Sequence, residues 1–190
     1  MDNYLDELLN YIPKSDQEEK DKEMILDLCK VYGDKLLDRN TLFAHLSASG
    51  FVLNKDFTKV LMVFHNIFKS WSWTGGHADN ERNLFCVAKR EVEEETGVKN
   101  LIPVSENIIS LEVLPVYSHY KNGKYVSNHL HLNLTYVFIA SEEETLRVKE
   151  DENSGVKWIN VGELKDNVKE KLMLPVYEKI IRQAKECINK

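Results

Sequence analysis

The run from Leu84 to Thr96 constrains the chain most, because it puts acids and apolar residues on one side of a helix. A rotation of about 100° per residue brings six of them into one arc roughly 120° wide. That arc contains Leu84, Val87, Ala88, Glu91, Glu94 and Glu95. Carboxylates on a buried stripe are costly unless cations neutralise them or they line a wet cleft. Because oxygen ligands at i, i+3 and i+4 converge, the pattern predicts a site for Mg²⁺ or Mn²⁺.

The residues around this stripe support the same interpretation. Glu93 falls on the opposite side and can pair with Lys89 four residues earlier, so an ordinary surface role explains that acid alone. Gly75 and Gly76 precede the helix and allow the backbone to approach a bound phosphate closely. Gly97 stands where a left-handed residue commonly ends a helix. Together the glycines frame the acids.

Gly76 and the run from Arg90 to Val98, which reads REVEEETGV, resemble the Nudix box. The length and fixed spacing of this motif make it a specific signal. The resemblance implies an α/β fold, in which a mixed β-sheet lies between helices as an α/β/α sandwich. It also implies a loop, helix and loop that hold divalent metal against a diphosphate. Members of this family hydrolyse nucleoside diphosphates linked to another moiety.

The motif can be carried over residue by residue. Glu91, Glu94 and Glu95 match the acids that bind metal, either Mg²⁺ or Mn²⁺, and one of them is a candidate general base. Arg90 matches the arginine that braces a glutamate without being a ligand. The segments 45–50 and 73–79, which read HLSASG and WTGGHAD, look like those of a bacterial Nudix subgroup of unassigned substrate.

One position departs from the motif. The box normally has a glutamate six residues after its first glycine, and Arg82 stands there, directly after Glu81. Glu81 could substitute after a small adjustment of the loop, or the site could bind fewer metals. A non-catalytic nucleotide sensor with the same fold is a further alternative, although the three box acids oppose it.

A further carboxylate is expected on the loop opposite the box. Glu152, six residues before Trp158, is the candidate, and a solvated loop charge is the competing interpretation. On the predicted strand from His129, alternation gives a polar face with His131, which either lines the substrate cleft or meets water.

Three substrate-binding candidates lie near the glycines, and each has a simpler alternative. We expect Gly75, Gly76 and His77 to approach a phosphate, although a loop histidine is often merely exposed. Trp73 is a candidate for stacking on a base, but aromatic residues at strand ends more often cap a core. His45 and His65 are interpreted as structural, and Cys86 is rejected as a nucleophile because it points away from the acids.

The rest of the chain suggests two regions. Residues 1–40 are predicted to form a helical extension. A first helix is indicated by the helical spacing of Leu5, Leu8, Leu9 and Ile12. Ser15 is predicted to begin a second helix, whose inward residues are Ile25, Leu28, Cys29 and Tyr32. Residues 41–190 form the proposed Nudix domain, with a hairpin over 48–64, strands over 108–116, 130–139 and 156–159, and helices over 84–96 and 174–188.

Composition limits the partners. A net charge of −6 argues against a nucleic-acid binder with a broad basic surface. No stretch approaches the roughly 20 apolar residues of a membrane span, and the segment that begins at Met1 lacks the basic region and apolar run of a signal peptide, so we expect an unprocessed protein. Three distant cysteines suit a reducing cytoplasm rather than a disulfide framework. We expect a cytoplasmic enzyme with a small nucleotide substrate, no nucleic-acid or membrane partner, and a possible homodimer.

An isomerase is the alternative enzyme class. Isoprenoid diphosphate isomerases resemble this fold and also bind a metal and a diphosphate. They need a cysteine near the glycine loop, and residues 71–79 contain none. The sequence therefore favours hydrolysis of a phosphoanhydride bond over isomerisation.

Overall fold

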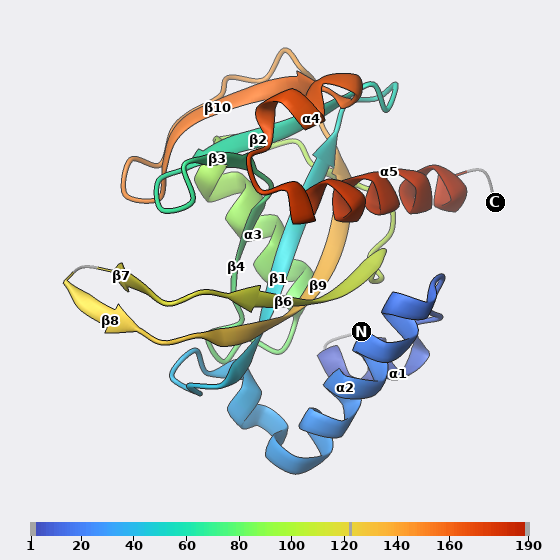
Figure 1. Cartoon of the computed structure of the whole chain (residues 1–190). Coiled ribbons are helices and arrows are strands. Elements are labelled where there is room, and N and C mark those ends of the chain that lie inside the picture. The colour runs from blue at the N-terminus through green and yellow to red at the C-terminus, as the bar shows by residue number, and fades with distance from the viewer. Residues whose placement is uncertain (1–2, 122, 189–190) are drawn as a thin grey trace.

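A computed structural model describes residues 3–121 and 123–188 of the chain. The outermost residues of the two predicted regions, 1–2 and 189–190, lie outside that description. A mixed sheet forms the centre, with the strand order β10-β2-β1-β9-β5. Three further strands join it, because β3 pairs with β2, β4 with β1, and β6 with β9 (Figure 1). The strands are β1 (Ala44–Leu53), β2 (Lys59–His65), β3 (Ser70–Ser72), β4 (Thr74–His77), β5 (Ile102–Pro103), β6 (Ser110–Val116), β7 (His119–Lys121), β8 (Lys124–Val126), β9 (His129–Ile139) and β10 (Asn153–Asn160).

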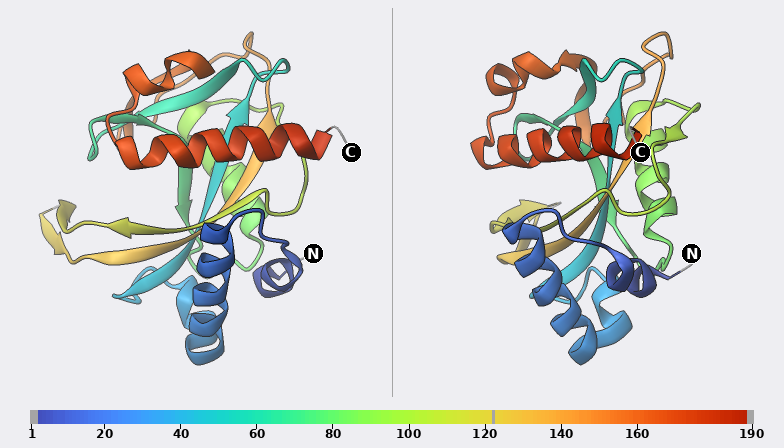
Figure 2. Two further views of the ribbon diagram at one scale, coloured as in Figure 1. Left: turned by 45° about the vertical axis from the view of Figure 1, so that its right-hand side comes forward. Right: turned by 90° about the vertical axis from the view of Figure 1, so that its right-hand side faces the viewer.

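Helices cover both faces of this sheet, so the predicted three-layer α/β/α fold is confirmed (Figure 2). On one face lies α3, and on the other lie α2 and α5. The α-helices are α1 (Tyr4–Asn10), α2 (Asp16–Tyr32), α3 (Leu84–Thr96), α4 (Leu164–Asn167) and α5 (Leu174–Ile188). Three 3₁₀ turns are described as well: η1 (Gly33–Leu37), η2 (Val161–Glu163) and η3 (Lys171–Met173). Among the described residues, no helix is both long and apolar enough to cross a bilayer.

The pairing of β1 with β9 organises the polar face. These two strands run parallel, with His45 opposite His131 and Ser47 opposite Asn133. The antiparallel strand β4 lies on the other side of β1 and puts His77 opposite Ser47. Because alternate side chains point to opposite faces of a sheet, all five of these residues share the face opposite α3.

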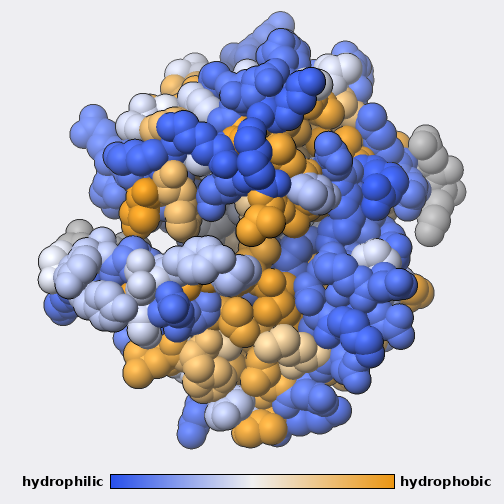
Figure 3. Space-filling view, viewed as in Figure 1, coloured by the Kyte–Doolittle hydropathy of each residue, from blue (hydrophilic) through white to orange (hydrophobic). Residues whose placement is uncertain are grey.

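The molecular surface on the side of β6 is uneven (Figure 3). The β7–β8 hairpin projects as an arm, and the surface is hollowed between this arm and the upper part of the domain. Apolar side chains gather lower on the same face, where the end of α2 and the loop before β1 lie. The exposed apolar residues of those two segments include Val31, Tyr32, Leu42 and Phe43.

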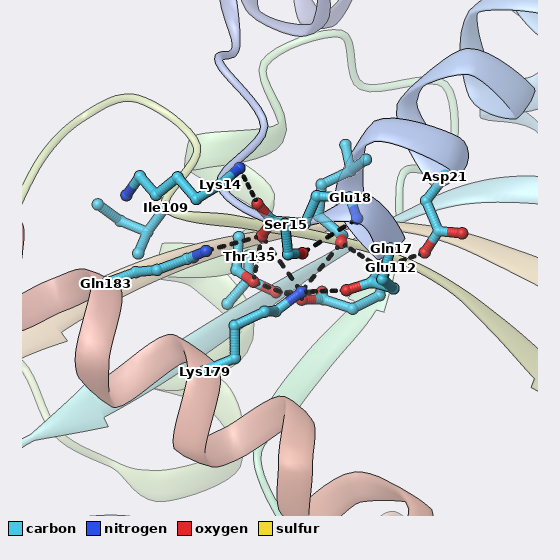
Figure 4. Close-up of polar contacts among 12 residues, drawn as sticks. Lys14, Ser15, Gln17, Glu18, Asp21, Ile109, Glu112, Thr135, Lys179 and Gln183 are labelled. Carbon is cyan, nitrogen blue, oxygen red and sulfur yellow. Dashed lines mark hydrogen bonds and ion pairs between the residues drawn. The ribbon is translucent and has the colours of Figure 1, made fainter.

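The N-terminal helices pack into the core. A buried polar network joins α2 to β6 and α5 (Figure 4). The Lys179 ammonium lies 3.2 Å from a Glu18 oxygen and 2.9 Å from a Glu112 oxygen. Gln183 donates to Glu18 at 3.0 Å, and Ser110 donates to it at 3.2 Å. A buried carboxylate with several partners fixes α2 against the sheet, because leaving any of them unpaired would be costly.

Most predicted elements are present, with corrections in the N-terminal segment. Leu8 is buried as expected, but Leu9 and Ile12 are 57% and 79% exposed. Helix α1 ends at Asn10, and Ile12 precedes a proline, which disfavours helical geometry, so the helical spacing does not extend that far. Tyr11 is buried in its place and donates its hydroxyl to the Ile109 carbonyl at 3.3 Å.

The inward face of α2 also needs one correction. Ile25 and Cys29 are buried as expected, and the Ser15 side chain caps the helix by accepting from the Glu18 amide. Tyr32, expected to point inward, is exposed. Gly33 ends the helix directly after it, and the Tyr32 ring packs against Phe43, with 4.6 Å between ring centroids.

Candidate active site

Helix α3 has a capping residue at each end, and the sequence predicted the one at its C-terminal end. Asn83 caps its first turn by accepting from the Cys86 amide, and Gly97 ends it with φ of 82° in the left-handed region. Val92 is fully buried on the side that faces β1. Cys86 is exposed on the outer side of the helix. The acidic second half of the helix therefore has a fixed position next to the sheet edge.

Three carboxylates meet at this edge. Glu91, Glu95 and Glu152 each offer an oxygen, and these oxygens lie within 4.8 Å of one another. Glu95 is only 4% exposed, whereas Glu152 comes from the loop before β10 and has a half-exposed side chain. Asn153 secures that loop, because its side-chain amide donates to the backbone carbonyl of Glu95 at 3.0 Å.

The glycines before the helix fit closely against these acids. Gly75 donates its backbone N–H to the Glu95 carboxylate at 3.0 Å. A Cβ atom at Gly76 would lie 2.6 Å from the Glu91 carboxyl carbon, and one at Gly75 would lie 2.9 Å from the Ala48 carbonyl oxygen. Both distances are too short for a side chain, so larger residues here would displace the acid or the strand.

Ionisation of Glu91 and Glu95 is unfavourable when no cation is bound. Burial raises the pKa of Glu95 to about 8, and the neighbouring carboxylates of Glu152 and Glu91 add to the rise, while the hydrogen bond from Gly75 opposes it. Burial is also the main cause of the raised pKa of Glu91. A cluster of oxygen donors that resists ionisation by itself is chemically suited to Mg²⁺ or Mn²⁺.

Glu94 lies outside the three-carboxylate cluster. Its side chain is 47% exposed, although the helical arc predicted a more buried position. The Lys149 ammonium, on the loop before β10, lies 2.9 Å from a Glu94 oxygen and 3.2 Å from a Glu152 oxygen. This ion pair draws Glu94 towards the loop. Sequence reasoning missed Lys149, whose only signal is its place three residues before Glu152.

Arg90 lies beside the same acids. Its guanidinium is 3.6 Å from a Glu91 oxygen and 4.0 Å from a Glu94 oxygen. This arrangement has the geometry of the bracing arginine that the motif implies. Glu93, the surface acid, lies 4.0 Å from the Lys89 ammonium, as the i,i+4 spacing suggests.

Arg82 faces away from the acids and contacts the N-terminal helices. Its guanidinium pairs with Asp34 and donates to the Asn3 side chain at 3.1 Å. The Arg82 carbonyl accepts from the Tyr4 amide at 3.1 Å. Glu81 accepts from the Asn83 amide at 2.8 Å, which is a local turn contact. Neither residue belongs to the three-carboxylate cluster.

The polar face of β9 divides into two parts. Asn133 and Thr135 are buried, and both bond to Glu112, at 3.3 and 3.0 Å respectively. His129 and His131 are half-buried and belong to a group of four imidazoles with His45 and His77. His45, interpreted from sequence as structural, is thus close to three predicted substrate-binding histidines.

Trp73 packs on the opposite side of the domain from α3. Its ring makes an edge contact with Tyr177 of α5, with 5.4 Å between centroids, and belongs to the core beneath that helix. In this position Trp73 covers the core, which is the alternative to base stacking. A stacking role for Trp73 stays a prediction.

Comparison with known proteins identifies the family. A family model described as the NUDIX domain matches residues 44–183. The chain belongs to the Nudix family. A curated relative, the RNA pyrophosphohydrolase of Pelagibacter ubique, is 31% identical over 144 residues, which cover 73% of this chain and 89% of the relative. The protein is accordingly a hydrolase that acts on pyrophosphate bonds.

Solved structures support the Nudix fold independently. The E. coli dihydroneopterin triphosphate pyrophosphohydrolase has a TM-score of 0.55 at 18% identity, covering 72% of this chain and 94% of that chain. A C. elegans Ap4A hydrolase has a TM-score of 0.52 at 16% identity, covering 70% of this chain and 93% of that chain. At such identities the likeness concerns the fold alone.

Proposed function

We propose that this Nudix hydrolase cleaves the phosphoanhydride bond of a nucleoside diphosphate linked to another moiety, and that it needs Mg²⁺ or Mn²⁺. The observation that carries the proposal is the convergence of Glu91, Glu95 and Glu152 beside Gly75. The raised pKa values of Glu91 and Glu95 show that their ionised forms are unfavourable in this site, and a divalent cation would offset that cost.

The donor set suits such a cation, because every ligand atom is a carboxylate oxygen. Glu91, Glu95 and Glu152 would hold the metal, and Glu94 would join them if its pair with Lys149 opened. When bound, Mg²⁺ supplies the positive charge and Lewis acidity that metal-assisted phosphoryl hydrolysis requires. A carboxylate of the cluster accepts the proton that the attacking water loses.

Other residues of the chain position these groups and the substrate. Gly75 orients Glu95 through its backbone N–H, and the missing side chain of Gly76 leaves room for the Glu91 carboxylate to lie against the strand. Arg90 lies against Glu91, where its charge limits the repulsion within the cluster. Lys149 holds the loop carboxylate of Glu152 towards the helix. His77 follows the glycines, but its side chain points to the sheet face opposite Glu91, so its contact with the bound phosphates stays a prediction.

The substrate class is inferred from the family and from charge. The relative from Pelagibacter ubique is named for its action on RNA, which makes a triphosphorylated RNA end a second candidate substrate. The net charge of −6 favours a small nucleotide instead, because a long phosphate backbone would be repelled.

The decisive experiment incubates the purified chain with a panel of phosphoanhydrides in ¹⁸O-labelled water. The panel contains nucleoside triphosphates, ADP-ribose, dinucleoside polyphosphates, coenzyme A and a 5′-triphosphorylated RNA, each with Mg²⁺ or with EDTA. Product masses then identify the substrate and the phosphorus that water attacks. The matched variants Glu95→Gln and Glu93→Gln exclude a contaminating enzyme, since only the first should lose activity. Undiminished cleavage in EDTA, or by Glu95→Gln, would refute the proposal.

Two further expectations accompany this function. A homodimer remains a proposal, for which the exposed apolar group of Val31, Tyr32, Leu42 and Phe43 offers a surface. Light scattering of the wild type and a Leu42→Ser variant tests it. The cytoplasm remains the expected location, because the cysteines Cys29, Cys86 and Cys187 are all free thiols.

A further inference from the structure

Four histidines from three strands gather on the sheet face opposite α3. The ring centroid of His45 lies 4.9 Å from that of His77, 4.8 Å from that of His129 and 5.0 Å from that of His131. His77 and His131 are also 5.0 Å apart. In His45, His77 and His131, one ring nitrogen of each residue lies within 4.8 Å of those of the other two.

His45 has a buried nitrogen with no partner. The residue is only 4% exposed, and its Nδ1 lies 3.3 Å from the Thr41 carbonyl oxygen. A carbonyl can only accept, so Nδ1 carries the proton and Nε2 keeps its lone pair. That Nε2 is buried and makes no hydrogen bond. A carbonyl partner on one ring nitrogen is the arrangement that orients metal-binding histidines through the other.

His129 shows the same arrangement at the open side of the group. Its Nδ1 lies 2.8 Å from the Ser127 carbonyl oxygen, so its Nε2 also keeps a lone pair. That Nε2 lies 3.3 Å from Nε2 of His131. His45 and His129 thus each keep a lone pair on Nε2, and the lone pair of His129 faces the His131 ring. Neutral imidazoles are the form that binds metal.

We propose that His45, His77 and His131 form a second metal site, which binds one divalent transition-metal ion of the Zn²⁺ class. Three imidazoles with one open position are a ligand set that proteins use for zinc. His129 is placed to fill the fourth position, or water fills it. Nitrogen ligands select Zn²⁺, Co²⁺ or Ni²⁺ over Mg²⁺, which prefers oxygen.

The geometry requires only a small contraction. Zinc–nitrogen bonds of about 2.0–2.1 Å in a tetrahedron put ligand nitrogens roughly 3.3 Å apart. The present spacing, up to 4.8 Å, exceeds that value by an amount that side-chain rotation can supply. The backbones are already fixed, because His45 is opposite His131 in the parallel pair and both strands are central to the sheet.

This site is separate from the carboxylate cluster. Gly76 faces Glu91 on the α3 side of the sheet, whereas the next residue, His77, points to the opposite face. The two sites share no ligand and differ in donor chemistry. Loss of one should therefore leave metal binding at the other measurable.

The test measures zinc and cobalt binding to the full chain after EDTA treatment, with Mg²⁺ in excess to occupy the carboxylates. We expect about one equivalent of Zn²⁺ per chain, since one three-histidine set is present. Co²⁺ should give the intense visible bands of a four-coordinate ion. His77→Gln and His131→Gln should each weaken Zn²⁺ binding by more than the roughly 10–100-fold that loss of a ligand's partner costs.

Two variants serve as controls. His119→Gln alters a half-buried histidine that is not a member of the group and should leave zinc stoichiometry and the cobalt spectrum unchanged. Glu95→Gln removes a carboxylate donor and should also preserve the cobalt bands. Circular dichroism checks the folding of each variant, and the wild-type measurement stands even if a variant unfolds.

Several outcomes would overturn the proposal. The first is a wild type that binds no Zn²⁺ in the presence of excess Mg²⁺. The second is a cobalt spectrum typical of six-coordinate oxygen ligation. The third is bound zinc that disappears with Glu95→Gln but persists in His131→Gln. If zinc binding is absent and the histidine variants instead raise KM, the rings line the substrate cleft and are not metal ligands.

Discussion

Gly75 donates its backbone N–H to the buried carboxylate of Glu95, 3.0 Å away, and so joins the glycine strand to the acidic helix. The two residues are 20 positions apart in the sequence, and this hydrogen bond fixes the position of the acid relative to the glycine strand. The glycine lets β4 lie close to β1, and its amide donates to an acid whose pKa is raised to about 8. A change at Glu95 should therefore affect both the free energy of unfolding and the proposed metal binding.

Without metal, Glu95→Gln should stabilise the protein increasingly as pH rises. The pKa of Glu95 is raised from 4.5 to about 8, so between these values the folded state holds a proton that the unfolded state has lost. This group therefore lowers the free energy of unfolding as pH rises through that window, and the loss is complete above about pH 8. Thermal unfolding of both proteins in EDTA from pH 4 to 9 measures the difference, and a pH-independent difference would contradict the assignment.

Mg²⁺ should reverse that ranking. A cation that binds the folded state raises the melting temperature by mass action, and it needs the ionised carboxylate. We expect a larger Mg²⁺-induced rise for the wild type at pH 8 than at pH 5, and little rise for Glu95→Gln at either pH. The variant should also lose at least about 100-fold in turnover, the upper range for perturbing a metal ligand's surroundings.

Glu94→Gln should also lose most activity, but less than Glu95→Gln. Glu94 lies outside the three-carboxylate cluster and is paired with Lys149, so we expect a loss of roughly 10-fold, typical of a group next to the ligands. Glu93→Gln is the matched control, because its exposed pair with Lys89 contributes about 0–1 kcal/mol. Steady-state kinetics at saturating Mg²⁺ compares the three, and equal turnover of Glu94→Gln and wild type would exclude a role for Glu94.

The helix and its acids could be predicted because their evidence is local. The period of Leu84, Val87 and Ala88 gives the buried side of α3, and Gly97 gives its end. The position of Glu94 could not be predicted in this way. It depends on Lys149, which is 55 residues away and reaches the helix only after β10 pairs with β2. Contacts between distant segments are not encoded in helical spacing.

The histidine group illustrates the same limit in the sheet. Alternation along β9 correctly puts His129 and His131 on one face. The proximity of His45 and His77 depends on the order of strands β4, β1 and β9, which no single segment specifies. The sequence predicts a glycine loop at residues 74–77, where the structure has strand β4. It pairs with β1 since only glycine fits against Ser49 and Glu91 there.

Glu81→Gln should leave metal affinity nearly unchanged. The Glu81 carboxylate accepts from the Asn83 amide and lies outside the carboxylate cluster, so its loss affects the start of α3 and not a ligand. Arg82→Glu should lower the melting temperature, because it places a carboxylate against Asp34 where an ion pair now joins the N-terminal helices to the domain. Calorimetric titration with Mg²⁺ and thermal unfolding test both. A large loss of affinity in Glu81→Gln would show that Glu81 replaces the missing box acid.

Lys179→Met should destabilise the protein strongly without changing any member of the three-carboxylate cluster. The ammonium is nearly buried and lies within 3.2 Å of Glu18 and 2.9 Å of Glu112, so its loss leaves two buried carboxylates without their cation. Breaking a buried ion pair in this way costs about 3–5 kcal/mol. Urea unfolding should show that loss, whereas Lys185→Met, an exposed lysine on the same helix, should change stability little. Because the network joins Glu18 of α2 to Glu112 of β6, a large effect would support its role in holding residues 1–40 against the domain, and equal stability of the two variants would contradict that role.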